Sequence, residues 1–239
     1  MTSHNSVNYI KSQIDSILSQ IGDEDELIIS DDGSVDGSVE LIKSINDVRI
    51  RLLSFSQPHT YSNKRLPFFY LASANFANAL QYAKGDCIFL ADQDDVWMPN
   101  KYRVCIEALH DNDIVCHNFG IIDEDGNVLE EQHFPTGCFE RLSLVGFWKY
   151  FPFRGCCLAF NKKVYNLCMP IPDGTFEHDC WIGMNSVMHN LKYKFIDTPL
   201  INYRRHSGNV SELQSPNSLM FKLYYRMVLL CRIIKYWSR

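Results

Sequence analysis

A run of carboxylates directly follows a short apolar segment, and this feature constrains the chain most. Residues 87–90 (Cys-Ile-Phe-Leu) have the pattern of a buried strand, and Asp92, Asp94 and Asp95 come directly after them. Open α/β sheets bind their ligands at the carboxyl ends of their strands. Three carboxylates so close together repel one another unless a cation lies between them, and oxygen ligands suit Mg²⁺ or Mn²⁺. The sequence therefore predicts a metal site at a strand end.

A second acidic pair follows another short apolar segment. Residues 26–30 predict a strand, and Asp31 and Asp32 lie in the turn behind it. Two such strand ends in one chain indicate a metal–nucleotide site. We expect Ser34 or Asp36 to cap the helix that follows at residues 38–45.

Helical and strand patterns alternate along the chain. The predicted helices are residues 7–20, 38–45, 72–83 and 101–110, the predicted strands are 26–30, 49–54, 87–90, 113–119 and 126–131, and residues 56–69 are predicted as a loop. This alternation predicts an α/β fold with a mostly parallel sheet. A length of 239 residues fits one domain or two.

Composition excludes several classes. The formal net charge of −5 gives no basic surplus, so we expect no nucleic-acid partner. The nine cysteines form no C-x-x-C pair, which predicts reduced, mostly buried thiols in a cytoplasmic protein. We expect no signal peptide, and no apolar run reaches the roughly 20 residues that a membrane span needs.

Five short motifs, in order, resemble those of family 2 glycosyltransferases, which have the GT-A fold. They are residues 31–37 (Asp-Asp-Gly-Ser-Val-Asp-Gly), 83–97 with the carboxylate run, 154–161 (Arg-Gly-Cys-Cys-Leu-Ala-Phe-Asn), 177–181 (Glu-His-Asp-Cys-Trp) and 203–210 (Tyr-Arg-Arg-His-Ser-Gly-Asn-Val). The His-Asp-x-Trp pattern and His206 are most similar to rhamnosyltransferase-like bacterial members. The resemblance implies a three-layer α/β/α GT-A domain over residues 1–212 and a C-terminal helix over 213–239.

The resemblance also implies an activity. It is the inverting, metal-dependent transfer of a sugar from a UDP- or dTDP-linked donor to a hydroxyl of a saccharide or lipid-linked saccharide, in surface polysaccharide synthesis. Asp92 would face the ribose and a metal-bound water, and Asp94 would hold Mg²⁺ or Mn²⁺. His206 would close the metal or diphosphate site. Asp95 would support these groups or cap the next helix.

Two motifs are expected to contact the donor. Asp31 and Asp32 would recognise the nucleoside, and the family pattern favours the first acid for the base. The alternative is an Asx-turn with a helix cap. Arg204 and Arg205 would neutralise the diphosphate through bidentate contacts.

The remaining motifs concern the acceptor. Asp179 would be the general base, with Glu177 as the alternative, because the attacking hydroxyl must lose its proton. The alternative is that Asp179 and Glu177 belong to a solvated acidic loop without a catalytic role. Gly155 lies in the acceptor-side glycine segment. Trp181 is either a platform for a sugar or a core tryptophan.

The C-terminal segment differs from the rest of the chain. Residues 217–239 are rich in apolar and aromatic side chains, carry five Lys or Arg and contain no acid. This composition is typical of helices that lie on an anionic membrane surface, here the inner face of the cytoplasmic membrane. The alternative is a helix that packs on the catalytic domain or on a second subunit.

One departure from the family concerns the first strand. The family has a hydrophobic strand before a Thr-Tyr-Asn-like turn, whereas this turn would fall at residues 2–5 (Thr-Ser-His-Asn). The loss would leave unpaired backbone groups beside the site, at a cost of about 1–3 kcal/mol each if buried. We therefore expect a start further upstream or a damaged gene product.

Two other functions remain open. A degenerate homologue that binds a nucleotide without turnover is supported by the short first strand and opposed by the full set of acidic motifs. A sugar-nucleotidyltransferase would have a Gly-rich phosphate loop near the N-terminus, and residues 2–5 contain no such loop.

Overall fold

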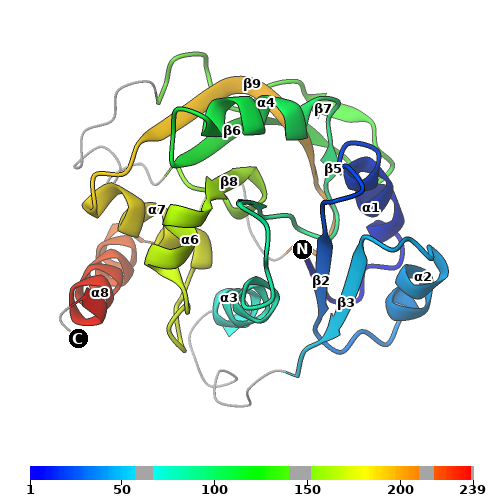
Figure 1. The fold of residues 1–239 in the computed structure, drawn as a ribbon, viewed down its shortest axis with the longest axis horizontal. Helices are drawn as coiled ribbons and strands as arrows, with labels where there is room; N and C mark the ends of the chain where they lie inside the picture. The colour runs from blue at the N-terminus through cyan, green and yellow to red at the C-terminus, as the bar shows by residue number, and fades with distance from the viewer. Residues whose placement is uncertain (57–66, 140–151, 210–217, 238–239) are drawn as a thin grey trace.

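The computed structural model describes residues 1–56, 67–139, 152–209 and 218–237, which form two sheets with helices packed around them (Figure 1). The helices are α1 (Ile10–Leu18), α2 (Ser38–Ser44), α3 (Pro67–Leu80), α4 (Lys101–Leu109), the 3-10 turn η2 (Gly155–Cys157), α6 (Lys162–Cys168), α7 (His178–Met188) and α8 (Leu219–Trp237). The strands are β1 (Thr2–Ser3), β2 (Leu27–Asp31), β3 (Ile50–Ser54), β4 (Cys87–Phe89), β5 (Val96–Trp97), β6 (Ile114–Ile122), β7 (Val128–Glu130), β8 (Leu158–Asn161) and β9 (Tyr193–Arg204).

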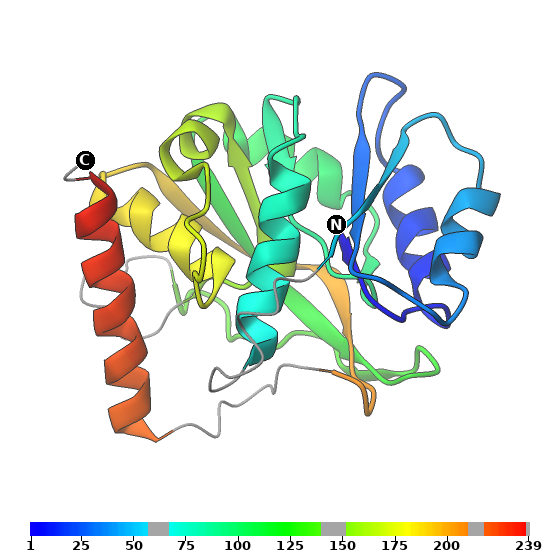
Figure 2. The ribbon, with the colours of Figure 1, turned by 90° about the horizontal axis from the view of Figure 1, so that it is seen from below.

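The first sheet has the order β1-β2-β3 and is parallel throughout. Helices α1 and α2 lie on one side of it and α3 lies on the other, as Figure 2 shows. All five residues of β2 are buried, as expected for a central strand covered on both faces.

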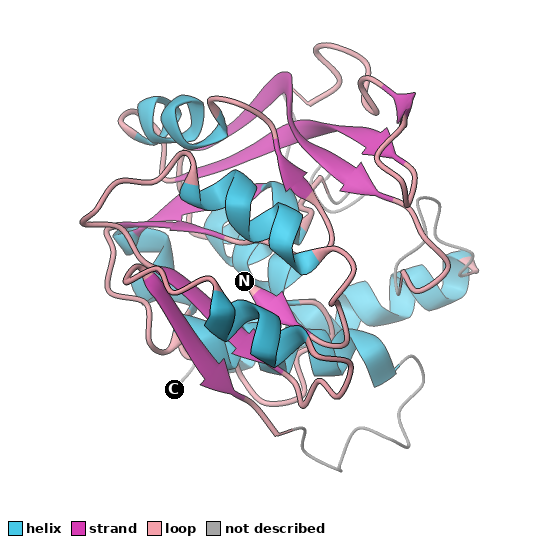
Figure 3. Ribbon diagram, turned by 90° about the vertical axis from the view of Figure 1, so that its right-hand side faces the viewer, coloured by secondary structure: helices cyan, strands magenta, loops and turns pink. Residues whose placement is uncertain are grey.

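The second sheet is mixed, which corrects the prediction of a mostly parallel sheet. Its order is β4-β8-β6-β9-β5, with β7 on β6, and within the described residues β6 and β9 are its one parallel pair. Strand β7 follows β6 after a short turn without an intervening helix, so these two neighbours are antiparallel. The α/β class itself is confirmed, with strands enclosed between helices (Figure 3).

The first strand is short but pairs closely with β2. The Met1 ammonium donates to the Ile28 carbonyl at 2.8 Å, Ser30 donates to the Met1 carbonyl at 3.0 Å, and Asp32 donates to the Ser3 carbonyl at 2.8 Å. The unpaired groups expected on this side of β2 are therefore satisfied at these positions. Thr2 also donates to the Ala91 carbonyl at 3.4 Å, which brings the two acidic strand ends together.

Some predicted boundaries shift. Helix α3 begins at Pro67, so the end of the predicted loop 56–69 is helical, consistent with the preference of proline for a first helical turn. Residues 57–66 of that loop lie outside the described part of the chain. All nine cysteines are free and six of them are buried, as predicted.

Helix α8 packs on the body of the protein through one of its faces. The side chain of Ile233 is 1 % exposed, and the Trp237 indole donates to the Asn185 amide oxygen of α7 at 2.9 Å. This confirms the alternative of packing on the catalytic domain. Among the helices described, none is both long and apolar enough to cross a bilayer.

Candidate active site

The carboxylate run forms a loop between β4 and β5 that is held from both sides. On one side, the Gln13 amide of α1 donates to the Asp92 carbonyl at 2.8 Å. On the other, the backbone N–H of Arg204 donates to Asp95 Oδ1 at 3.2 Å. Asp95 is 1 % exposed, and its second oxygen, Oδ2, has no hydrogen-bond partner in the part of the chain that the structure describes.

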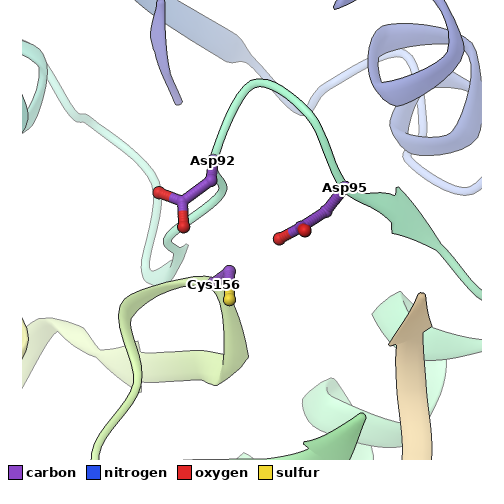
Figure 4. A group of neighbouring side chains, drawn as sticks. All are labelled: Asp92, Asp95 and Cys156. Atoms are coloured by element: carbon purple, nitrogen blue, oxygen red, sulfur yellow. The ribbon is translucent and has the colours of Figure 1, made fainter. Parts of the chain in front are cut away.

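Asp92 and Asp95 face Cys156 across this loop (Figure 4). One ligand atom of each of the three side chains lies within 4.8 Å of the others. Burial, together with the charges of Asp94 and Asp179, raises the pKa of the Asp92 carboxyl to about 7. Burial and the neighbouring acids raise the pKa of Asp95 well above its usual range. A bound cation would relieve this repulsion, so the donor set fits a divalent metal.

Asp94 is paired with His206, and the role of the two residues in a metal site stays a prediction. The His206 Nε2 lies 2.9 Å from Asp94 Oδ2, and the Asn209 amide donates to the same oxygen at 3.2 Å. Because the Gly208 N–H donates to His206 Nδ1 at 3.1 Å, the proton of a neutral ring belongs on Nε2 and points to Asp94. Binding a metal through Nε2 would require this proton to move to Nδ1.

Arg204 has a different role from the one predicted. Its guanidinium donates to the carbonyls of Asp94 at 2.9 Å, Asp123 at 3.2 Å and Glu124 at 3.0 Å. The side chain is buried and joins two loops through their backbones, so the predicted diphosphate contact is corrected to a positioning role. Arg205 is half-buried, and its predicted contact with the diphosphate stays a prediction.

Asp31 is engaged inside its own turn. Its two carboxylate oxygens accept hydrogen bonds from the Ser34 backbone N–H at 2.9 Å and from the Ser34 hydroxyl at 2.6 Å. This is the Asx-turn alternative for the first acid of the pair. Asp36 accepts from the Ser38 backbone N–H at 3.0 Å, so Asp36 satisfies the first turn of α2 and Ser34 does not.

Asp32 lies beside the turn and next to His4. The His4 Nδ1 is 2.7 Å from the Asp32 carbonyl oxygen, and the His4 backbone N–H donates to the Gln93 side chain of the other acidic loop. Burial raises the pKa of the Asp32 carboxyl to about 6. These contacts bring the β2 and β4 strand ends into one site.

Asp179 stands in the first turn of α7, where the helix dipole favours a negative charge. Its Oδ2 accepts the Gly155 N–H at 2.9 Å and its Oδ1 accepts the Cys180 N–H at 2.7 Å. The Cys180 thiol donates to Glu177 Oε2 at 3.1 Å. Burial and the charge of Asp179 raise the pKa of Glu177 to about 7. The two candidate bases therefore lie in one cluster with Cys180, and Asp179 links this cluster to Gly155.

Trp181 is a core residue, which is the second of its two alternatives and corrects its placement among the sugar-binding candidates. Its side chain is fully buried, and the indole N–H donates to the Cys168 carbonyl at 3.0 Å. The ring also packs edge-on against Tyr236 of α8, with 5.3 Å between ring centroids.

Three residues at the site had no role in the sequence analysis. The Cys156 thiol faces the acids, His178 stacks on Phe76 with 3.9 Å between ring centroids, and Asn209 bonds Asp94. Each of the three lies within one of the quoted motifs, and this was the signal that could have found them. The depth of Cys156 and His178 depends on contacts between distant segments.

Comparisons with known proteins show which family the sequence matches. Residues 1–167 match the model of Glycosyl transferase family 2. The chain is similar to chondroitin synthase of Pasteurella multocida (strain Pm70), with 28 % identity over 219 residues, 84 % of this chain. It is also similar to an Escherichia coli UDP-Glc:alpha-D-GlcNAc-diphosphoundecaprenol beta-1,3-glucosyltransferase, WfgD, with 30 % identity over 130 residues, 54 % of this chain.

A solved structure shares the fold. The crystal structure of S. aureus TarS in complex with UDP-GlcNAc superposes with a TM-score of 0.67 over 95 % of this chain, at 15 % identity. The matches cover only part of each relative: 22 % of the chondroitin synthase, 47 % of the glucosyltransferase and 64 % of the TarS chain.

Proposed function

The chain belongs to Glycosyl transferase family 2 and is a glycosyltransferase with the GT-A fold, and from this premise we propose its reaction. The proposed reaction moves a sugar from a UDP- or dTDP-linked donor to a hydroxyl of a saccharide or lipid-linked saccharide, with inversion at the anomeric carbon. The proposed setting is the synthesis of a surface polysaccharide. The catalytic unit is proposed to span residues 1–212.

The observation that carries this proposal is the meeting of three acidic segments. The charge of Asp179, from the start of α7, acts on Asp92 in the β4–β5 loop and helps to raise its pKa. The β2 turn with Asp32 joins them through His4 and Gln93. This arrangement supports a donor nucleotide held between the first two segments and an acceptor hydroxyl placed against the third.

A divalent cation is part of the proposal. Asp92, Asp94 and His206 are the residues that would hold Mg²⁺ or Mn²⁺, and their oxygen and imidazole donors suit either ion. When bound, the cation neutralises the charge that develops on the leaving diphosphate. Asn209 keeps Asp94 in place by donating to its Oδ2, and Arg204 keeps the loop backbone in place.

Asp179 is the proposed general base. It would accept the proton of the acceptor hydroxyl as that oxygen attacks the anomeric carbon. The Gly155 N–H fixes Oδ2 and the Cys180 N–H fixes Oδ1, so the carboxylate keeps one orientation during the attack. Glu177 stays the alternative base: its pKa is raised to about 7, a value suited to proton transfer at neutral pH, and its Oε2 accepts from the Cys180 thiol.

Names of relatives support the substrate classes. The E. coli relative is named for UDP-Glc and a diphosphoundecaprenol-linked sugar, and the TarS structure contains UDP-GlcNAc. We infer from them a UDP-linked donor and a lipid-linked or polymeric saccharide acceptor for this chain.

The proposal is tested by the melting temperature of the protein with UDP, dTDP or GDP, with and without Mn²⁺. A ligand present at about 100 times its Kd stabilises the native state by about 2.7 kcal/mol. We expect a Mn²⁺-dependent rise with UDP or dTDP that Asp94→Ala abolishes. Asp179→Asn should keep this rise and lose sugar transfer. A cooperatively melting protein that no nucleotide stabilises would contradict the proposal, and binding without transfer would favour the degenerate homologue.

We also propose that α8 contacts an anionic membrane surface as a peripheral element. Its outer face carries an exposed apolar stripe at helical spacing, made of Met220, Tyr224, Met227 and Ile234. The helix contains four Lys or Arg and no acid. This charge suits acidic lipid headgroups.

Co-sedimentation with vesicles tests this contact. We expect binding to phosphatidylglycerol-containing vesicles and not to phosphatidylcholine alone, and Met220→Asn with Met227→Asn should weaken it. The control is Val128→Asn with Leu129→Asn, which changes two exposed apolar residues on β7 instead. Equal losses in both double variants would contradict a specific α8 contact.

A further inference from the structure

We propose that Asp92, Asp95 and Cys156 form a binding site for a thiophilic divalent cation such as Zn²⁺, and that a cation held there competes with the donor nucleotide. The inference rests on the proposed function, because Asp92 also belongs to the proposed metal–nucleotide site. It adds a second position for a cation, with sulfur among its ligands.

The buried carboxylate of Asp95 is the first observation. Its Oδ1 accepts the Arg204 N–H, whereas its Oδ2 is buried without a partner among the described residues. A buried acceptor without a partner destabilises the folded state. Figure 4 shows this side chain directed toward Cys156 and Asp92. A ligand that binds between these three groups would satisfy it.

The donor set selects the ion. Two carboxylate oxygens and one sulfur lie within 4.8 Å of one another. With Zn–O bonds of about 2.0–2.2 Å and a Zn–S bond of about 2.3 Å, tetrahedral donors stand roughly 3.4–3.6 Å apart. Small side-chain rotations would bring the three donor atoms from this separation to the spacing that a tetrahedral ion needs. Three protein ligands leave a fourth position open for water or a phosphate oxygen, and a thiolate favours Zn²⁺ over Mg²⁺ or Mn²⁺.

Lys101 holds Cys156 in place and balances the charge. Its ammonium is fully buried and donates to the Cys156 carbonyl at 2.8 Å. Two carboxylates and a thiolate, set against this one ammonium, leave two negative charges, which a divalent cation neutralises. Binding releases to solvent the proton of the Cys156 thiol and any proton that the Asp92 and Asp95 carboxyl groups hold.

Asp94 lies outside the cluster formed by Asp92, Asp95 and Cys156. Asp94 Oδ2 is taken by His206 and Asn209, and Asp94 is not a member of the three-residue cluster. The two cation positions can therefore be separated by mutation, with Asp92 shared between them.

Titration with Co²⁺ alone, in place of Zn²⁺, tests the inference through the ultraviolet thiolate-to-cobalt charge-transfer band. We expect the band in the wild type, in Asp94→Asn and in the control Cys231→Ser, whose cysteine is exposed on α8. Cys156→Ser and Asp95→Asn should lose it. Zn²⁺ should displace Co²⁺ and weaken the Mn²⁺-dependent stabilisation by UDP in the wild type.

The outcomes are separable from those of the proposed function. A band that persists in Cys156→Ser, or its absence in a wild type that UDP and Mn²⁺ stabilise, overturns the thiol site alone. A band without any stabilisation by nucleotides overturns the proposed function and leaves the cation site standing. If Cys156→Ser fails to fold, Asp95→Asn gives the same decision, because that variant keeps every thiol.

Discussion

The backbone N–H of Gly155 points at Asp179 Oδ2 across 2.9 Å, so a turn before β8 fixes the carboxylate at the start of α7. A Cβ atom at residue 155 would lie 3.0 Å from His178 Nε2 and 3.8 Å from that same carboxylate oxygen. The glycine is thus required by close approach and not by its backbone conformation.

Gly155→Ala should lower kcat by about tenfold with little change in donor affinity, since a hydrogen bond to a charged group contributes about 1.5–3 kcal/mol. Steady-state kinetics with varied donor measure this split. Gly85→Ala is the matched control, because a Cβ there meets only a backbone oxygen at 3.5 Å. A variant with unchanged kcat would show that the bond does not position the base.

Glu177→Gln should make the stability of the protein less dependent on pH. The folded-state pKa of Glu177 is about 7, above the ordinary value of 4.5. Its protonated form therefore favours the folded state at low pH, and this contribution is lost as pH rises from about 4.5 through 7. Glutamine carries no charge, so at pH 8 the variant should be more stable than the wild type. Each kcal/mol of added stability should raise Tm by about 2–4 °C.

Thermal melts of both proteins at pH 5 and pH 8 measure this difference. Glu107→Gln serves as the control, because Glu107 is exposed on α4. If Tm changes by the same amount between pH 5 and pH 8 in the wild type and in Glu177→Gln, then Glu177 does not contribute to the pH dependence of stability.

His206→Ala and His206→Gln should both lower the affinity for Mn²⁺ in the presence of UDP. We expect a loss of about 10–100-fold, the range typical when a group that supports a metal site is removed. Glutamine can donate to Asp94 but is a poor ligand, so it separates two roles of the histidine. Calorimetric titration with Mn²⁺ at fixed UDP gives the affinities. A wild-type Mn²⁺ affinity in His206→Gln would mean that the ring acts only by donating its Nε2 proton to Asp94.

Arg204→Lys should destabilise the fold by about 2–4 kcal/mol, because a lysine cannot reach the carbonyls of two loops at once. Chemical denaturation measures the loss, and nucleotide affinity should fall with it. Arg103→Lys, on an exposed helix face, should change neither quantity. An Arg204→Lys protein of full stability but reduced affinity would instead support a direct contact with the diphosphate.

Local patterns predicted the elements that carry the chemistry. The apolar runs before Asp31 and Asp92 are strands, as predicted. They belong to different sheets, and the two acidic turns meet through the contacts of Thr2 with Ala91 and of His4 with Gln93. The motif resemblance placed Asp179 and His206 beside this edge.

The sequence alone did not predict features that depend on pairing over long distances. The β4–β8 and β6–β8 ladders are antiparallel because of how distant segments return to the sheet. The roles of Arg204 and Trp181 follow from burial, which their motifs do not encode: both looked like ligand-binding residues and both support the structure. The position of Cys156 beside Asp92 and Asp95 depends on how its turn packs against the β4–β5 loop.

The bonds from Arg204 to the β4–β5 loop have a consequence for the order in which the enzyme matures. Asp94 and Arg204 are 110 positions apart, so the loop acquires its backbone support only when the last strand has joined the sheet. Contacts of such long range form late and slowly. A nascent chain still lacking β9 would carry every acid of the donor site without this backbone support, so we expect nucleotide binding to appear only after β9 has joined the sheet.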